Sequence, residues 1–425
     1  MLVLSLLEEQ SISSSCKRIL VMDLENNESD TNLNVQGLES GGVVLYDPTV
    51  SNTVSPVSPL PAEITSLSTD ALGQSGDEKQ ETKKDLPWAL EYISCLLHLA
   101  VLGIFGVLTR YLLQKLFGPA GIVPATGNHS YMYLDLPSNM VSLCVGSFLM
   151  GWFGVVFKRD IAKVSDFLAL GLTTGYLGSL TTFSGWNQEM LDLSVEGQWD
   201  FVFLGFVVGL VLVVASLRIG IRSAKGFRWL LKRLNTSPEH GISNSKRNWK
   251  VDNYKRHLTV TVVLVLMLGI LYGVTGTLLN KEFDSGSSEA HLWLACMVGP
   301  LGVWIRWWLS RLNGRGLGRA GLLKWFPFGT LIANVFAACV MAALAILKTV
   351  VNTKTCDNVA NGIQFGLLGC LSTVSTFIVE FHALVESKHT WRAEAYGLIT
   401  IVTSFVLGTL IYSLPFWIKG YKSYS

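Results

Sequence analysis

The stretch GLTTGYLGSLTTFSGWNQE, Gly171–Glu189, returns in the same chain as GIQFGLLGCLSTVSTFIVE, Gly362–Glu380. Three glycines keep their spacing, and the Thr-Thr pair at 181–182 becomes Ser-Thr at 372–373. Each copy is apolar overall but has small and hydroxyl-bearing residues at its centre. Such a centre is tolerated inside a membrane only where protein or a water-filled cavity surrounds it. The pattern therefore predicts two membrane helices, each broken at a site.

Composition predicts that most of the chain lies in a membrane. Charged residues make up 15% of the 425 and hydrophobic residues 50%, whereas about a quarter of the residues in soluble domains are charged. The mean hydropathy is +0.41, and the net charge of +2 gives no sign of a nucleic-acid partner. The seven cysteines lack metal-ligand spacing, and we find no nucleophile elbow or phosphate loop. We expect an integral membrane protein that is not an enzyme.

Nine apolar segments follow a polar N-terminal region. Residues 1–86 are rich in Ser, Asn, Asp and Pro, which predicts a disordered cytoplasmic tail. A membrane-spanning helix needs about 20 mostly apolar residues. The segments that meet this requirement are 88–116, 137–157, 165–190, 199–221, 258–280, 290–312, 327–348, 361–386 and 394–417.

Two sets of four segments flank the single segment 258–280 and match each other in order. GIFGVLTRYLLQKLFG at 103–118 faces GPLGVWIRWWLSRLNG at 299–314 without a gap. The fourth segments align more weakly, through Gly209 and Gly408. The polar pairs brought into register are Arg110 with Arg306, Asn139 with Asn334, and Glu189 with Glu380. The predicted domains are the tail (1–86), a first repeat (87–221), a basic cytoplasmic linker (222–257), a linker helix (258–280), a second repeat (281–417) and a C-terminal tail (418–425).

Basic residues in the short loops predict the orientation, because cytoplasmic loops carry an excess of Lys and Arg. The loop 118–136 has none, whereas 218–257 is crowded with them. This places the N-terminus inside and the C-terminus outside. Each repeat has an even number of spans, so the one added span makes the second repeat start on the other side. The fold predicted is thus an all-α membrane protein of nine helices, with two antiparallel four-helix repeats, joined by one helix, whose third helices are broken. Inverted repeats tend to hold a solute site near the midplane.

The polar residues inside these segments have structural and functional readings. Freed carbonyls at the glycine-hydroxyl centres can hold a cation and hydroxyls can donate to an anion, whereas small residues alone serve close helix packing. The repetition of glycines with adjacent hydroxyls favours a site. Asn139 and Asn334 either bond between helices or donate to a passing ion, and both readings stay open. Intramembrane carboxylates such as Glu189 and Glu380 are functional candidates.

Arg110 and Arg306 lie near the ends of their predicted helices. A long basic side chain at such a place usually extends to the membrane interface. The alternative is that it attracts anions into a vestibule. We assign both arginines, together with Glu189 and Glu380, to such a vestibule as candidate residues.

The chain resembles the Fluc (CrcB) family of fluoride channels over about Trp88 to Phe416. The resemblance rests on GxxG followed by Arg in the first segment, Asn in the second, and GxxGxLTTFS in the third. Two copies joined by one extra helix are similar to the eukaryotic FEX fluoride exporters. The resemblance implies a passive, fluoride-selective channel in the plasma membrane, complete as a monomer, with two pores and a structural sodium ion between the halves. The backbone carbonyls implied for the sodium are those of Gly178, Thr181, Gly369 and Ser372.

The same resemblance implies an aromatic pair in each pore, one ring from each half, with the positive ring edges facing the anion. Phe183 with Phe377 completes one pair, but the other pore receives Val374 with Trp186. The family's Ser four residues before a Gly on the fourth helix is Ser404 in the second repeat and Gly205 in the first. We expect one working and one vestigial pore. The polar residues expected to line the pores are Asn139, Asn334, Ser404, Thr400, Thr182, Ser184, Thr373 and Ser375.

The membrane potential, negative inside, would drive fluoride outward without ATP or a proton relay. Two other functions fit an inverted repeat. A secondary transporter for another small solute predicts saturable, coupled transport. A membrane scaffold, in which the repeats only pack, predicts no flux.

Overall fold

The computed structural model describes residues 87–117, 136–234, 254–284, 289–316 and 323–419. These residues belong to one compact unit and form helices and short turns, with no strand in the described ranges. The predicted tail, residues 235–253 of the predicted basic linker and the last six residues lie outside the described residues. The expectation of an all-helical membrane protein is confirmed for the part of the chain that is described.

Eight helices in the described part are long and apolar enough to cross a membrane. In the first half these are α3 (Trp88–Phe117), α4 (Leu136–Met150) with the π-helical turns η1 (Gly151–Val156), and α9 (Trp199–Leu234). In the second half they are α11 (Ala290–Ser310), α12 (Phe328–Val351), a helix that begins with α13 (Lys354–Ile363), and α16 (Trp391–Gly408) continued by η4 (Thr409–Ser413) and α17 (Leu414–Lys419). Between the halves lies α10 (Tyr254–Asp284).

The ninth predicted segment, 165–190, is helical but discontinuous. It consists of α6 (Asp166–Leu170), η2 (Gly171–Leu177), α7 (Gly178–Leu180) and α8 (Phe183–Val195). Two extended residues, Thr181 and Thr182, separate α7 from α8. This discontinuous segment is not among the eight, so its role as a ninth span stays a prediction.

The equivalent helix of the second half is broken at the equivalent place. After α13 it continues as η3 (Gln364–Leu368), α14 (Gly369–Leu371) and α15 (Ser375–Glu386), with Ser372 extended. In both copies a hydroxyl at the break donates a hydrogen bond to a carbonyl of the preceding turn. Thr181 Oγ1 donates to Leu177 O at 3.0 Å, and Ser372 Oγ donates to Leu368 O at 3.1 Å. Such bonds compete with the helix. The predicted break in each third helix is confirmed.

Helix α9 extends well beyond the predicted end at residue 221. Residues 222–234, predicted as the start of a linker, are therefore helical. Arg228 anchors this extension, because it donates to Val156 O at 2.5 Å and pairs with Asp160, which lies on the short helix α5 (Lys158–Val164).

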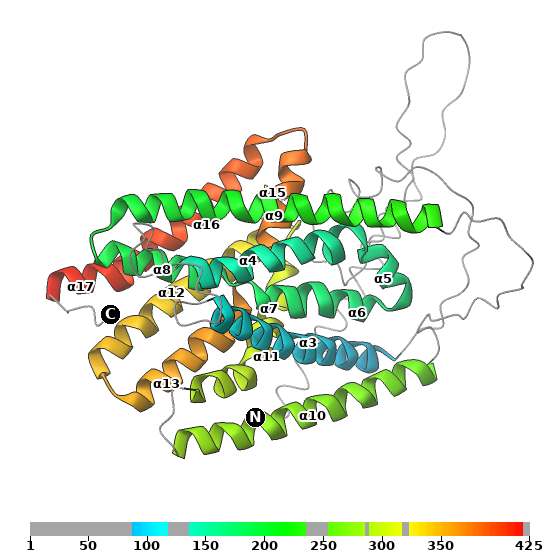
Figure 1. Ribbon diagram of the computed structural model, residues 1–425, viewed down its shortest axis with the longest axis horizontal. Helices are drawn as coiled ribbons and strands as arrows, with labels where there is room; N and C mark the ends of the chain where they lie inside the picture. Colours follow the sequence, from blue (N-terminus) through cyan, green and yellow to red (C-terminus); the bar gives the residue numbers. More distant parts are fainter. Residues whose placement is uncertain (1–86, 118–135, 235–253, 285–288, 317–322, 420–425) are drawn as a thin grey trace, which may run out of the picture. The chain divides into compact units, whose positions relative to one another are not determined.

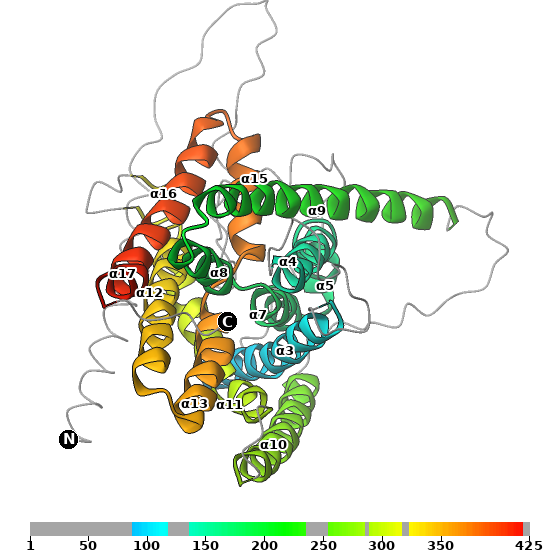
Figure 2. The same ribbon diagram turned by 60° about the vertical axis from the view of Figure 1, so that its left-hand side comes forward.

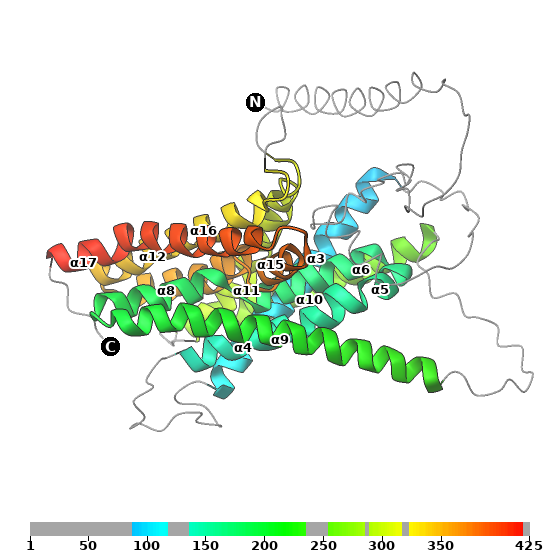
Figure 3. The same ribbon diagram turned by 90° about the horizontal axis from the view of Figure 1, so that it is seen from above.

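Helix α10 contacts α3 and α11, and α9 contacts α4 (Figure 1). In Figures 1 and 2, α9 and α10 lie on opposite edges of the bundle, with α3, α7 and α11 between them. Only about a tenth of the apolar window of α10 is buried, so most of its surface is left for lipid. Seen from above in Figure 3, α16 runs alongside α12 and α8. The two breaks lie inside this bundle, since every residue from Gly178 to Ser184 is buried.

Candidate functional site at the paired helix breaks

The two helix breaks bind each other through reciprocal hydroxyl contacts. Ser375 N donates to Thr181 Oγ1 at 3.0 Å, and the hydroxyls of this pair are also 3.0 Å apart. Ser184 N donates to Ser372 Oγ at 3.1 Å, and these hydroxyls are 2.8 Å apart. Thr181 is equivalent to Ser372 and Ser184 to Ser375, so the same pair occurs twice with the halves exchanged. Such a self-complementary contact is what a two-fold relation produces.

The breaks also leave main-chain carbonyls without helical partners. In the described part of the chain, no main-chain hydrogen bond outside the helices ends on the carbonyls of Gly178, Thr181, Gly369 or Ser372. These are the four groups that the resemblance assigns to sodium. Bare carbonyl oxygens can replace the hydration shell of a small cation. The donor set therefore fits such an ion.

The two arginines of the first helices reach across to the opposite half. Arg306 Nη2 donates to Thr174 O at 2.7 Å, and Arg110 Nη2 donates to the equivalent carbonyl of the second half. Gly178 makes room for the Arg306 guanidinium and Gly369 for that of Arg110, because a Cβ at either position would overlap it. Both arginines are buried. They therefore neither extend to a membrane interface nor face a water-filled vestibule, contrary to the sequence-based expectation, and their charges oppose a cation beside the two glycines.

The aromatic pair predicted from the resemblance is present. The ring centroids of Phe183 and Phe377 are 6.0 Å apart, at an interplanar angle of 54°, and both rings are fully buried. Phe377 also contacts Tyr396 on α16, with centroids 5.1 Å apart. Thr400 and Ser404 follow Tyr396 at intervals of one helical turn and are buried too. We call the group formed by Phe183, Phe377, Tyr396, Thr400 and Ser404 the α16 side.

A buried carboxylate ends the α16 side where α16 begins. Glu380 accepts hydrogen bonds from Tyr396 OH at 2.7 Å, Thr330 Oγ1 at 2.8 Å and Asn313 Nδ2 at 3.0 Å. It is fully buried and therefore does not line an open vestibule. Its counterpart Glu189 is only partly buried and has its own interactions. The sequence patterns did not predict these three donors. Tyr396 could have been found, because it lies one helical turn before Thr400 and two turns before Ser404, on the same face of α16.

The two asparagines of the second helices differ in what they contact. Asn334 binds the break of its own half at two points: its Nδ2 donates to Thr373 O at 3.1 Å and its Oδ1 accepts from Thr373 N at 2.8 Å. Asn139 is equally buried, but its Oδ1 has no partner among the described residues. Asn334 thus has a structural role, and Asn139 keeps a free acceptor.

The threonines after the breaks accept hydrogen bonds from the first turns of the helices that follow, Thr182 as the N-cap of α8 and Thr373 from one residue before the N-cap of α15. Thr182 Oγ1 accepts from Gly185 N at 3.2 Å, and Thr373 Oγ1 accepts from Thr376 N at 3.4 Å. A side-chain oxygen at this position satisfies a free amide of the first helical turn. Both hydroxyls are therefore already engaged in the structure.

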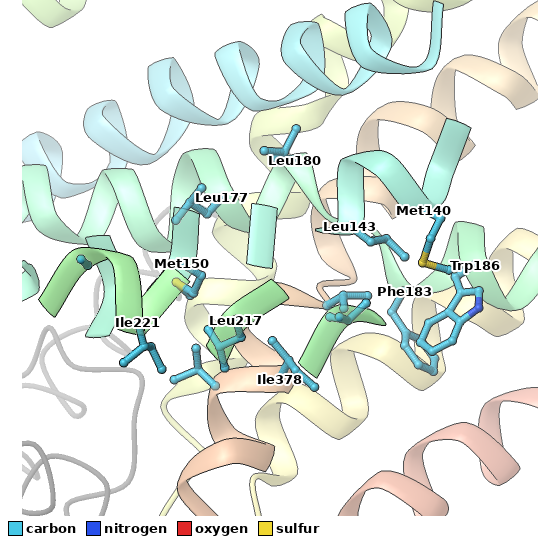
Figure 4. Close-up of a cluster of buried hydrophobic side chains, with 14 of the residues drawn as sticks. Met140, Leu143, Met150, Leu177, Leu180, Phe183, Trp186, Leu217, Ile221 and Ile378 are labelled. Atoms are coloured by element: carbon cyan, nitrogen blue, oxygen red, sulfur yellow. The ribbon is translucent and has the colours of Figure 1, made fainter. Parts of the chain in front are cut away.

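The other side of the breaks, which we call the α9 side, is apolar. Trp186, Val374 and Ile378 are buried there in the cluster shown in Figure 4, where Met140 lies against the Trp186 indole. A Cβ at Gly209 would lie 2.5 Å from that indole, so Gly209 admits the ring.

The α9 side also lacks the polar residues of α16. In the register that aligns Gly209 with Gly408, the positions of Tyr396, Thr400 and Ser404 hold Gly197, Phe201 and Gly205. Gly205 is buried. A cavity opens between η1, η2 and α15 on this side; it is lined by Met150, Gly154, Lys158, Thr173, Thr174, Thr376 and Val379.

Comparison with known proteins identifies the duplicated unit. The family described as "CrcB-like protein, Camphor Resistance (CrcB)" matches residues 97–221 and again 293–412, which together are more than half of the chain. The two matches fall in the two predicted repeats and confirm the tandem arrangement of two family units.

Similar full-length proteins come from fungi. The Fluoride export protein 1 of Candida albicans is 24% identical over 374 residues, which cover 82% of this chain and 86% of that protein. The protein of the same name from Saccharomyces cerevisiae is 22% identical over 346 residues, 70% of this chain and 89% of that protein. The Fluoride-specific ion channel FluC 1 of Staphylococcus epidermidis is 37% identical over 112 residues, 26% of this chain and 82% of its own. No solved structure matches.

Proposed function

The chain belongs to the CrcB-like protein family, and from this premise we propose that it is a passive, fluoride-selective channel that exports fluoride from the cytoplasm. It is not an enzyme. The names of the fungal and bacterial relatives support fluoride as the ion. The observation that carries the proposal is the α16 side, where a buried aromatic pair adjoins a line of hydroxyl groups. Such groups can replace the water around a small anion, and the membrane potential drives an anion outward.

The proposed architecture has nine spans, with α6 to α8 as the ninth, and two antiparallel halves joined by α10. The reciprocal contacts of Thr181 with Ser375 and of Ser372 with Ser184 support it, because a two-fold relation produces them. The basic loops support a cytoplasmic N-terminus, an external C-terminus and, with the export role, a place in the plasma membrane. Because one chain supplies both halves, a monomer is sufficient.

We assign conduction to the α16 side alone. Phe183 and Phe377 form its aromatic pair, and Thr400 and Ser404 supply hydroxyls. Trp186 fills the corresponding space on the α9 side with an indole, where no hydroxyl replaces Ser404. The pore of that side is therefore vestigial.

A structural sodium ion at the breaks is part of the proposal. The carbonyls of Gly178, Thr181, Gly369 and Ser372 would hold it and would have to outweigh the opposing charges of Arg110 and Arg306 beside the two glycines. Its role is tested by unfolding the protein in detergent with sodium or with an organic cation of the same concentration. A higher unfolding temperature in sodium supports the site, and equal temperatures contradict it.

The function is tested with the purified full chain in liposomes. Efflux of internal fluoride is followed with a fluoride electrode, and chloride-loaded liposomes serve as the control. We expect rapid fluoride efflux that needs no second ion, together with negligible chloride efflux. Saturable transport coupled to another ion would favour the secondary transporter, and no flux at all would favour the scaffold. Normal growth in fluoride of cells that lack the protein would also count against export.

A further inference from the structure

One buried polar side chain next to the α16 side has no structural partner. Asn187 on α8 is 1% exposed, and neither its Nδ2 nor its Oδ1 has a hydrogen-bond partner among the described residues. Burying an amide without partners costs free energy. The equivalent position in the second half holds Ile378, which packs in the apolar cluster of the α9 side (Figure 4). Packing at this position therefore does not require a polar group.

The amide faces α16 close to a second unpartnered group. A Cβ at Gly408 would lie 3.2 Å from Asn187 Nδ2, which places the amide against that part of α16. Ser404 lies one turn before Gly408 and hence on the same face of the helix. Its Oγ is fully buried and also lacks a partner. Two unused donors thus lie about one helical turn apart along α16, on the face of α16 that contacts α8.

The polar groups continue along the same two helices. Ser194 lies two turns after Asn187 on α8, and Ser413 follows Gly408 on η4. Their hydroxyl oxygens are 2.8 Å apart, and both side chains are buried. The contact between α8 and the end of α16 therefore carries polar groups from Ser404 onward, in the direction in which both helices run.

We propose that Asn187 Nδ2 and Ser404 Oγ together form an anion-binding site for fluoride in the outer half of the pore. This inference rests on the proposed fluoride channel and on the α16 side as its pore. An N–H and an O–H donor on opposite helices can replace two waters of a small, strongly hydrated anion, and hydrogen bonds to an ion are stronger than those between neutral groups. Gly408 lets α8 approach α16 closely, because a Cβ there would lie 2.7 Å from Leu191 Cδ1 and 3.2 Å from Asn187 Nδ2.

The test measures fluoride efflux and thermal unfolding of the full chain for three variants. Asn187→Leu removes both polar atoms at similar volume, Asn187→Asp replaces the donor with an acceptor, and Asn187→Ser keeps a small donor. We expect efflux to fall at least ~10-fold in the first, which corresponds to about 1.4 kcal/mol in the barrier, and further in the second. The third should retain more than half of the wild-type rate. Ile378→Leu is the matched control and should conduct like the wild type.

Stability separates a binding role from a structural one. Because the amide has no partner, Asn187→Leu should unfold at the wild-type temperature or above it while its flux falls. Unchanged flux in Asn187→Leu overturns the inference, as does a parallel loss of flux and unfolding temperature in both the Leu and the Ser variants. If the wild type itself passes no fluoride, the proposed function fails; if the wild type conducts and Asn187→Leu conducts equally, only the site fails.

Discussion

The α16 side and the α9 side begin at equivalent residues of the two breaks and differ within one helical turn. On the α16 side, Phe183 and Phe377 adjoin buried hydroxyls and the carboxylate of Glu380. On the α9 side, Trp186 and Val374 lie among Met, Leu and Ile side chains. The hydrogen bonds that join the two breaks are nearly the same in both copies. Ser375 N lies 3.0 Å from Thr181 Oγ1, and Ser184 N lies 3.1 Å from Ser372 Oγ.

This difference separates two tasks that the duplicated helices perform. The contacts that join the halves are alike in both copies. Each of them lies at the interface between the two breaks, and both are needed to close it. Residues outside this interface can differ between the two copies without weakening it. A pair of Phe rings adjoins buried hydroxyls of α16 on one side only, so in the proposed channel conduction depends on the residues that differ between the copies and cohesion on those that agree.

The largest difference is expected for the aromatic residues. Phe183→Ile and Phe377→Ile should each lower fluoride efflux by roughly 100-fold, which is about 2.7 kcal/mol in the barrier, because each removes one ring of the same pair. Trp186→Ile should change the rate less than about 3-fold, since its ring packs in the apolar cluster and only supports Phe183 from behind the pair, with centroids 6.0 Å apart. Efflux from liposomes measures all three. Equal losses in the three variants would mean that both sides conduct.

The two glutamates should differ next. Glu380→Leu removes the acceptor of two buried donors, Tyr396 OH and Thr330 Oγ1, and of the partly buried Asn313 amide, and should lower the free energy of unfolding by about 3 kcal/mol. Glu189→Leu, at a partly buried position, should cost about 1 kcal/mol. Denaturant titration in detergent gives both values. A larger loss of unfolding free energy for Glu189→Leu than for Glu380→Leu would contradict this prediction.

A smaller difference is expected between the asparagines. Asn334→Leu removes two hydrogen bonds to the main chain of Thr373 and should destabilise the protein by about 2 kcal/mol. Asn139→Leu removes an unpaired acceptor and should cost at most about 0.5 kcal/mol. The same unfolding titration checks both variants. Comparable costs would show that Asn139 has a partner equivalent to Thr373.

The smallest difference is expected where the copies agree. Thr181→Val and Ser372→Ala each remove one of the reciprocal hydroxyls, and each should cost about 1 kcal/mol. The two values should agree within about 0.5 kcal/mol. Double-mutant cycles with Ser375 and Ser184 provide the measurement. Strongly unequal coupling energies in the two cycles would contradict a two-fold contact.

Local sequence patterns were sufficient for the repeats and the breaks. Glycine spacing and adjacent hydroxyls are properties of a short stretch, so the breaks after Gly178 and Gly369 could be placed without a structure. The pairing of Phe183 with Phe377 was also predictable, but only through the family resemblance. The repeats and the breaks need no knowledge of which side chains come from the other half.

Contacts between distant segments could not be read in this way. The arginines were expected near helix ends, yet the bundle closes around them and each guanidinium binds a carbonyl of the opposite half. Tyr396 and Asn313 were missed because their common partner Glu380 is far away in sequence. The helical extension of α9 contains Arg228, whose contacts lie on η1 and α5.

Helix α10 packs against α3 and α11 at the edge of the bundle and connects the two halves within one chain. This connection determines how substitutions reach the two halves. In an assembly of two identical chains, every substitution occurs twice, so a change that ruins one pore ruins both. In this chain each residue of the pair is encoded once. Position 374 can therefore hold Val while its counterpart, position 183, holds Phe, and a substitution in one copy leaves the other copy unchanged.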